Sequence, residues 1–297
     1  MIPIEGGANS NLAKVDTGTI ARQERPLSIG ELELKLLARF PREDAEPWDR
    51  TGLLVGDPAA LVTGVTVALD PTSDVIEMAR SAGTNVVLTH HPAFLDPPTA
   101  FSPSRAVASA SGVNVYKAIS EDVALMNFHT TLDVSSEAIE VLPGMLGLVR
   151  EGVLVPLPQD SKRGYGQICS VRDSDKPFRL SHLAARCTSV FGRLPRVWGD
   201  FTKKIETVVV ANGSAGNVVD AAVEHGVDCV VCGEIRYHAA LDASQAGLTI
   251  VELGHDASEI PLTAVLAKAA IEAGVPKKHV VVADQSKNWI TPDSTRI

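Results

Sequence analysis

The stretch DVIEMARSAGTNVVLT, residues 74–89, places a helical pattern, a glycine turn and a short apolar strand in immediate succession. A second stretch, NVVDAAVEHGVDCVVC, residues 217–232, repeats this order 143 residues further along the chain. The strand that precedes each stretch also recurs, as VTVALD at 65–70 and VVVANG at 208–213. A strand–helix–strand unit that occurs twice predicts two related α/β halves.

These strands are valine-rich and do not alternate apolar with polar residues, which is typical of sheets that are buried on both faces. We therefore expect an α/β fold of two related halves whose mostly buried sheets are flanked by helices. The repeat by itself is a weak argument, because any two strand–helix–strand units share valine-rich strands and glycine turns. The polar residues that end the strands in both halves are harder to explain in that way.

The predicted domain limits are a flexible leader at 1–26, a first half at 27–148 and a second half at 149–297. The leader mixes glycine, asparagine, serine and threonine with scattered charges, and it lacks the apolar centre of a signal peptide. Ser28 and Glu31 have the spacing of a capping box, which predicts the start of the first helix.

The composition favours a globular protein and argues against nucleic-acid-binding, membrane-spanning and disulfide-rich proteins. A chain of 297 residues with 45% hydrophobic content has enough apolar side chains for a large core. The formal net charge of −9 offers no basic surface for nucleic acid, and no apolar run approaches the ~18 residues that cross a membrane. Four scattered cysteines do not make a disulfide framework, so we expect a cytoplasmic protein.

Two short motifs have ordinary explanations that we prefer. Cys229 and Cys232 form a CxxC within an apolar strand, where residues three apart point to opposite faces, so we predict core residues and not a redox pair. The segment GSAG at 213–216 opens a helix and has backbone N–H groups that could hold a phosphate, but a plain turn needs no ligand.

The candidate functional residues stand at the ends of predicted strands. His90 and His91 follow the strand at 86–89, at the edge where open α/β sheets bind ligands. In two other segments a histidine precedes an acidic residue by four positions, which places both on one side of a helical turn. These pairs are His129 with Asp133 and His255 with Glu259.

Imidazole and carboxylate ligands together suit zinc, iron, manganese or a similar ion, and no cysteine lies in these segments. Three or four imidazoles and two carboxylates exceed what one tetrahedral ion needs. We therefore expect two divalent metal ions, which carboxylates commonly bridge at roughly 3.5–4 Å.

Six stretches of the sequence, taken in order, resemble the GTP cyclohydrolase 1 type 2 homologue family, also called dinuclear-metal-centre hexameric or NGG-interacting-factor-three-like proteins. The resemblance runs from about Leu27 to the C-terminus, and LTHHP followed by GHxxSE is its most specific part. The six stretches are WDRTGLLVGD (48–57), VALD (67–70), LTHHP (88–92), HTTLD (129–133), GEIRYHAALDA (233–243) and GHDASE (254–259).

The resemblance implies a dinuclear metal site in the cleft between the halves, with Glu259 as the bridge, and a homohexameric ring of subunits. The longer branch of the family inserts a domain between the halves, but here the second half starts soon after Leu148, so we expect no insert. Arg50 replaces a usual asparagine, and SSEAIEVL at 135–142 replaces a usual Gly-Val-Asn stretch; both departures put the substrate in doubt more than the metals. The implied metal ligands are His90, His91, Asp133, His255 and Glu259.

The expected function is hydrolysis of a small-molecule substrate, and the family name suggests a purine nucleotide attacked at a ring C=N bond. We expect His129 to be a catalytic acid or base, although its likeness to His255 leaves a role as ligand open. Asp70 could support a ligand, and His238 could line the same cleft or be an ordinary surface residue. The rival interpretations are a non-catalytic metal-binding regulatory protein and a dinuclear phosphoesterase or amidase.

Overall fold

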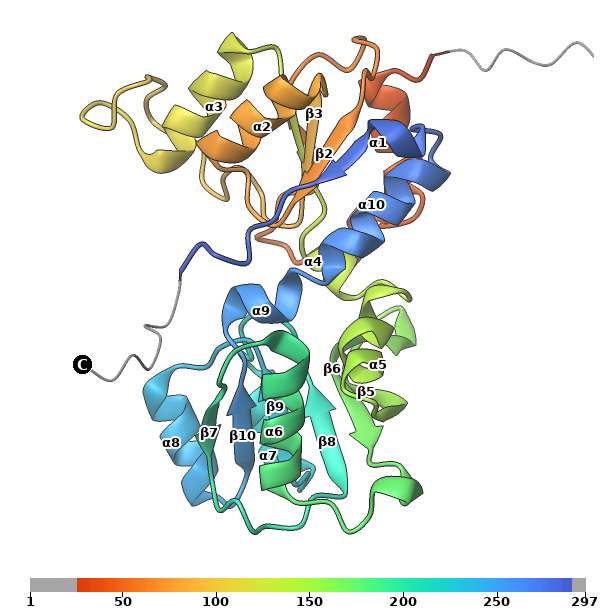
Figure 1. Ribbon diagram of the computed structural model, residues 1–297, viewed down its shortest axis with the longest axis vertical. Coiled ribbons are helices and arrows are strands. Elements are labelled where there is room, and N and C mark those ends of the chain that lie inside the picture. The colour runs from red at the N-terminus through yellow and green to blue at the C-terminus, as the bar shows by residue number, and fades with distance from the viewer. Residues whose placement is uncertain (1–25, 290–297) are drawn as a thin grey trace, which may run out of the picture.

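The computed structural model describes residues 26–289, so all of the predicted leader except Pro26 lies outside the described residues. Two sheets lie one above the other in Figure 1, and helices flank each of them. No helix within residues 26–289 has the length and apolar character needed to cross a membrane.

The first sheet has the strand order β1-β4-β3-β2-β11 and the second has the order β5-β6-β8-β9-β10-β7. The strands of the first sheet are β1 (Gly52–Val55), β2 (Val65–Ala68), β3 (Val86–Thr89), β4 (Ala124–Asn127) and β11 (Val280–Val282). Those of the second are β5 (Val149–Leu157), β6 (Asp160–Ser170), β7 (Arg196–Trp198), β8 (Thr207–Val210), β9 (Cys229–Cys232) and β10 (Thr249–Glu252).

Helices cover both faces of each sheet. The α-helices are α1 (Ile29–Leu37), α2 (Ser73–Ala82), α3 (Ala110–Ser120), α4 (Thr130–Asp133), α5 (Val141–Met145), α6 (Leu180–Phe191), α7 (Val218–Glu224), α8 (Tyr237–Gln245), α9 (His255–Glu259) and α10 (Leu262–Glu272). Side chains of α1 and α10 form one core of the first sheet, and those of α2 and α3 form the other. In the second sheet α6 packs on one face and α7 and α8 on the opposite face.

The two predicted halves share one topology. In each half an antiparallel edge strand, β1 or β7, precedes three parallel strands that are joined by two crossover helices. Val65 stands opposite Val86 in the first sheet, and Val208 stands opposite Cys229 in the second, so both strands keep the predicted shift of 143 residues. Every residue of β2, β3, β4, β9 and β10 is buried, which confirms sheets enclosed on both faces.

The limits predicted for the second half need a correction at its end. The chain crosses back after α9, and α10 packs against the first core through Leu262 and Leu266. β11 then pairs in parallel with β2, where Val280 stands opposite Val65. Otherwise β2 would be an open edge strand, and the apolar face of α10 would have no core to enter. Figure 1 shows this return as the blue helix and strand beside α1.

A β-hairpin opens the second half and was not predicted. β5 and β6 pair antiparallel and extend the second sheet beyond β8. Arg163 of β6 reaches the first half and forms an ion pair of 2.6 Å with the buried carboxylate of Asp44. The hairpin therefore links the two halves by this ion pair as well as by the covalent chain.

The CxxC cysteines lie where strand geometry predicts. Cys229 is buried in the core beside α6, and Cys232 is buried in the core on the opposite face of the same sheet. Both thiols are free, and burial raises the pKa of Cys229 to about 12. A redox pair needs an accessible thiolate and a nearby partner, so these cysteines serve the core.

Candidate metal centre

The predicted ligands meet between the two sheets. His90 and His91 directly follow β3, and Asp133 is the last residue of α4. His255 and Glu259 are the first and last residues of α9, which is a single helical turn. In Figure 1, α4 and α9 both lie in the region where the two halves approach each other.

The five side chains form two overlapping groups that share Glu259. In one, the Nε2 atom of His90 lies 3.5 Å from Asp133 Oδ1 and 3.5 Å from Glu259 Oε1. In the other, Glu259 Oε2 lies 2.9 Å from His91 Nε2 and 3.0 Å from His255 Nε2. Each oxygen of Glu259 thus faces a different group, as a carboxylate that bridges two ions does. The predicted convergence is confirmed, and ligation itself stays a prediction.

Four imidazoles at the centre are oriented in the same way. Each hydrogen-bonds through Nδ1 to an oxygen that carries no hydrogen, so Nδ1 is the donor and a neutral ring keeps an unprotonated Nε2. This outer hydrogen bond is the usual arrangement of histidines that ligate metals. The pairs are His90 with the Phe128 carbonyl (3.2 Å), His91 with Asp70 (2.7 Å), His129 with Asp49 (3.0 Å) and His255 with Glu234 (3.1 Å).

The centre fits a cation because its inward-facing atoms are nearly all acceptors. The Nε2 atoms of His91 and His255 face each other at 3.4 Å. Within residues 26–289, His90 Nε2 and Glu259 Oε2 are buried and make no hydrogen bond of acceptable geometry, although other ligand atoms lie close by. Buried acceptors without donors are costly, and divalent ions would satisfy both of these atoms.

The carboxylates of this site favour the protonated form of the neighbouring imidazoles. Burial lowers the pKa of His91, but its hydrogen bond to Asp70 and the nearby negative charge of Glu259 outweigh burial and raise that pKa to about 10. The Glu259 carboxylate, whose Oε2 lies 3.0 Å from His255 Nε2, is the main cause that raises the pKa of His255 to about 9. Burial opposes ionisation of Glu259, yet the surrounding imidazoles hold the pKa of Glu259 well below its usual range. Metal ions must therefore displace protons from these imidazoles.

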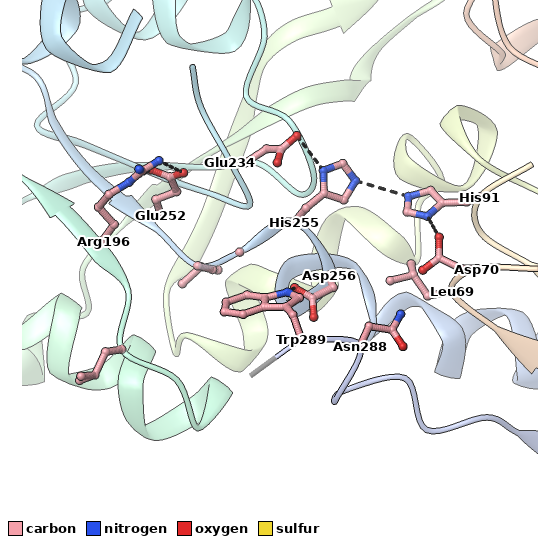
Figure 2. Close-up of a pocket in the computed structure, with 13 residues that line it drawn as sticks. Leu69, Asp70, His91, Arg196, Glu234, Glu252, His255, Asp256, Asn288 and Trp289 are labelled. Atoms are coloured by element: carbon pink, nitrogen blue, oxygen red, sulfur yellow. Dashed lines mark hydrogen bonds and ion pairs between the residues drawn. The ribbon is translucent and has the colours of Figure 1, made fainter. Parts of the chain in front are cut away.

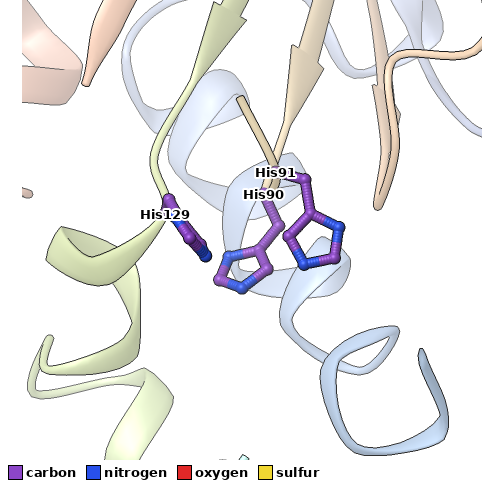
Figure 3. Close-up of side chains that lie close together, drawn as sticks. All are labelled: His90, His91 and His129. Atoms are coloured by element: carbon purple, nitrogen blue, oxygen red, sulfur yellow. The ribbon is translucent and has the colours of Figure 1, made fainter. Parts of the chain in front are cut away.

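His129 adds a third imidazole beside His90 and His91, as Figure 3 shows. One ring nitrogen of each lies within 4.8 Å of the other two. Asp49, whose side chain is fully buried, holds His129 Nδ1 and also accepts hydrogen bonds from the backbone and hydroxyl of Thr130. His129 is thus a fixed inward-facing base, and its geometry permits either a catalytic role or ligation.

The likeness between HTTLD and GHDASE is one residue out of register. In the parallel pairs with β3 and β9, Ala124 stands opposite Val86 and Thr249 stands opposite Cys229. The strands therefore correspond at a shift of 125 residues (249 minus 124), not 126. His129 corresponds to Gly254 in the second half, so its equivalence to His255 is wrong. Neighbouring positions at a strand end point in different directions, which explains why His255 lies in the group around Glu259 Oε2 and His129 lies in the group with His90 and His91.

Glycines allow the backbone to approach Glu259. Gly213 has a φ of +58°, and a Cβ atom there would lie 2.2 Å from Glu259 Oε1. Its N–H group donates to the Ser258 hydroxyl at 2.8 Å, so this part of the GSAG segment orders α9. The turn at 213–216 thus supports the structure of α9, in agreement with the prediction of a turn that needs no ligand.

Several supporting residues were missed in the sequence. Asp49 lies inside the WDRTGLLVGD stretch without being singled out, and Asn212 donates to Asp133. Glu234, which holds His255, corresponds to His91 at the shift of 143 residues, so the repeat contained a signal for it. Asp70, a residue left open, does support His91.

Two other residues lie outside the centre. His238 is exposed on α8 and packs against Tyr237, away from the cluster. The guanidinium of Arg50 lies over the ring of Phe94 and donates to the Leu95 carbonyl.

A pocket of about 620 Å³ opens onto His91 and His255 from the side, between the two halves. Figure 2 shows both imidazoles at one end of this pocket and the ion pair of Arg196 with Glu252 at the other. Trp289 also lines it. A pocket of this size is ordinary for a small-molecule site, and it gives a ligand a route to the histidines.

Known proteins share this fold and sequence. The sequence profile of Duf34/NIF3 (NGG1p interacting factor 3) matches residues 27–288. A "GTP cyclohydrolase 1 type 2 homolog" of Streptomyces coelicolor is 32% identical over 243 residues, which cover 78% of this chain and 82% of that protein. A protein of the same name from Clostridium acetobutylicum is 30% identical over 226 residues, with coverages of 75% and 82%.

Solved structures agree in fold. A hypothetical protein of Staphylococcus aureus superposes with a TM-score of 0.79 at 24% identity, over 90% of this chain and 99% of that chain. Reduced HcgD from Methanocaldococcus jannaschii superposes with a TM-score of 0.71 at 19% identity, over 88% and 99%. Taken with the profile match over nearly all described residues, these relatives show that the chain belongs to the Duf34/NIF3 family.

Proposed function

We propose that this protein is a hydrolase that depends on two divalent metal ions. The observation that supports this proposal is the convergence of imidazole nitrogens and carboxylate oxygens on one small, partly buried space. Bound ions would supply a Lewis acid and a water whose pKa is lowered towards neutrality. The proposed ligands are His90, His91, Asp133, His255 and Glu259.

The residues around the metal ions have separate tasks in this proposal. Asp49 holds Nδ1 of His129, which leaves Nε2 of His129 free to accept a proton from the attacking water. Glu234 and Asp70 fix the rings of His255 and His91, so that both Nε2 atoms stay directed inward. The pocket beside His91 and His255 admits the substrate.

The first substrate to test is a purine nucleotide, because the similar proteins from Streptomyces coelicolor and Clostridium acetobutylicum carry the name GTP cyclohydrolase 1 type 2 homolog. In the proposed step the water oxygen bonds to the carbon of a ring C=N bond. The π electron pair of that bond moves to nitrogen, and the proton that His129 took from the water is returned to that nitrogen. The bond from the hydrated carbon to its other ring nitrogen then breaks. Its electron pair stays on the leaving nitrogen, which takes up a proton, and the added hydroxyl loses its proton and becomes a carbonyl, so the ring opens.

The test is a turnover assay with protein loaded separately with Zn²⁺, Mn²⁺ and Fe²⁺. We expect a ring-opened product from GTP, followed by absorbance and mass. Absence of that product refutes the purine substrate, and a parallel panel of phosphodiesters and amides tests the wider hydrolase proposal. If metals bind with no solvent ligand and no panel member reacts, the protein is a metal-binding protein without catalysis.

Single variants separate ligation from catalysis. We expect His255→Ala to lose bound metal, whereas His129→Gln keeps the metal and lowers turnover by about 10²–10⁴-fold, the usual contribution of an acid–base residue. His225→Gln is the matched control, since His225 is exposed at the C-cap of α7 and its side chain bonds only the local Ala221 carbonyl in the described structure. Loss of metal in His129→Gln would make His129 a ligand and contradict its proposed role.

The homohexamer and the cytoplasmic location stay predictions. Light scattering after size-exclusion chromatography tests the assembly, and a monomeric mass at micromolar concentration would contradict it.

A further inference from the structure

The last described segment, residues 283–289, runs from the end of β11 to the start of α9, and we call it the C-terminal strap. Figure 1 shows it as the dark blue trace that leaves the first half and descends beside α9. The strap therefore spans the same side of the molecule as the pocket that opens onto His91 and His255.

At its first end the strap holds the loop after β2 through Gln285. This side chain is almost completely buried, with 6% of the residue exposed. Gln285 Oε1 accepts hydrogen bonds from the N–H groups of Leu69 (2.8 Å) and Asp70 (2.9 Å), and Gln285 Nε2 donates to the Asp70 carbonyl at 3.2 Å. One side chain thus satisfies three backbone groups at the residue that supports His91.

The Asp70 carboxylate transmits this restraint to the centre. It accepts from His91 Nδ1 at 2.7 Å, and that bond directs His91 Nε2 toward Glu259. About a third of the Asp70 side chain is exposed, so neighbouring side chains do not confine it fully. Its direction depends on its own backbone, which Gln285 holds.

At its other end the strap is tied to α9. The indole of Trp289 donates to Asp256 Oδ1 at 3.1 Å, and Asp256 directly follows His255. Arg193 forms two hydrogen bonds to the Asp256 carboxylate, lies 4.4 Å from the centre of the Trp289 ring and donates to the Ser286 carbonyl. The strap is therefore attached next to a predicted ligand of each half.

We propose that the C-terminal strap is a positioning element of the metal centre, and that Gln285 sets the metal affinity by holding Asp70 in the orientation that directs His91. Gln285 contacts no predicted ligand and acts only through Asp70. This inference rests on the metal binding proposed above and adds a residue that touches neither metal nor substrate.

The experiment measures the affinity of the full chain for Co²⁺ alone, by calorimetry and by the visible absorption of the bound ion. Replacing an outer partner of a ligating histidine commonly weakens metal binding by 10–100-fold. We expect Asp70→Asn to fall in that range and Gln285→Ala to weaken binding about tenfold.

A double variant tests whether Gln285 acts through Asp70. If it does, Asp70→Asn with Gln285→Ala binds Co²⁺ no more than about twofold weaker than Asp70→Asn alone. Gln167→Ala is the matched control, because Gln167 is also 6% exposed and bonds Arg150 and the Gly164 carbonyl instead. The control should keep wild-type affinity and an unchanged absorption spectrum.

Three results would overturn the proposal: wild-type affinity in Gln285→Ala, effects that multiply in the double variant, or an equal loss of affinity in Gln167→Ala. Gln285→Met, of similar volume, replaces the alanine variant if that variant does not fold. Failure of the wild-type protein to bind Co²⁺, Zn²⁺ or Mn²⁺ would refute the metal centre itself. If the wild-type protein binds metal and Gln285→Ala binds it with the same affinity, only the proposed role of the strap is refuted.

Discussion

Glu259 connects the two groups of ligands, because its side chain is nearly buried and each of its oxygens faces different imidazoles. Burial alone would favour the neutral acid, but the positive imidazoles keep the pKa of Glu259 low and the carboxylate charged. Gly213 leaves the space that this carboxylate occupies. The geometry of the candidate centre therefore depends on the absence of a side chain at Gly213 as well as on the predicted ligands.

Gly213→Ala should weaken metal binding and lower stability. The added methyl group would lie 2.2 Å from Glu259 Oε1, and the φ of +58° is unfavourable for alanine by about 1–2 kcal/mol. Gly226→Ala is the control, since Gly226 has a φ of +65° with no atom within 4 Å of the added carbon. We expect similar unfolding free energies for both variants but reduced metal content only in Gly213→Ala, measured by denaturation and by metal analysis. Equal metal content would contradict this role of Gly213.

At the scale of elements, the β5–β6 hairpin ties the second half to the first. Arg163 of β6 pairs with Asp44, whose side chain is only 2% exposed, and Gln159 at the hairpin turn donates to the same carboxylate at 2.8 Å. A buried carboxylate that loses its cation has no access to water in exchange, so the pair matters more than a surface ion pair.

Arg163→Ala should lower the free energy of unfolding by about 3 kcal/mol, the lower end of the range for breaking a buried pair, because Gln159 still donates to Asp44. Urea denaturation measures this change. Lys162→Ala, at the exposed neighbouring position, should stay within about 0.5 kcal/mol of wild type. If both variants unfold at the wild-type midpoint, the hairpin does not stabilise the contact between the halves.

At the scale of the whole molecule, the candidate metal centre lies where imidazole and carboxylate groups of both halves meet. The first half contributes two histidines and Asp133, and the second contributes His255 and Glu259. Without metal these groups attract each other only while the imidazoles are protonated. The attraction between the two halves therefore depends on the protonation of the imidazoles.

The metal-free protein should lose stability as the pH rises from about 6.5 to 10. The folded-state pKa values of His91 and His255, about 10 and about 9, exceed the ordinary value of 6.5, so their stabilising effect is complete below 6.5 and disappears on titration. Glu259, with its lowered pKa, makes the opposite contribution and loses it in acid.

With Zn²⁺ present, stability should instead rise between pH 6.5 and 8, because deprotonated imidazoles bind the ion better. Chemical denaturation at a series of pH values, with chelator and with Zn²⁺, checks both trends. A chelated protein that becomes more stable from pH 6.5 to 9 would contradict the protonated arrangement of the centre.

Short-range patterns in the chain are enough to predict the elements, the repeat and the candidate ligands. Valine-rich strands, the Ser28–Glu31 capping box and the glycine turns act over a few residues, so their patterns predict local structure directly. The histidines and acids at strand ends were predictable because the carboxyl ends of parallel strands meet at one edge.

Only the tertiary structure decided how distant segments combine. It placed β11 beside β2, directed Asp49 onto His129 and brought Gln285 of the strap onto the loop at Asp70. It also showed that His129 and His255 are not equivalent positions. These contacts join residues about 80 to 215 positions apart in the chain, and no local periodicity encodes them. They form because buried charges and backbone groups must find partners once the two halves pack together.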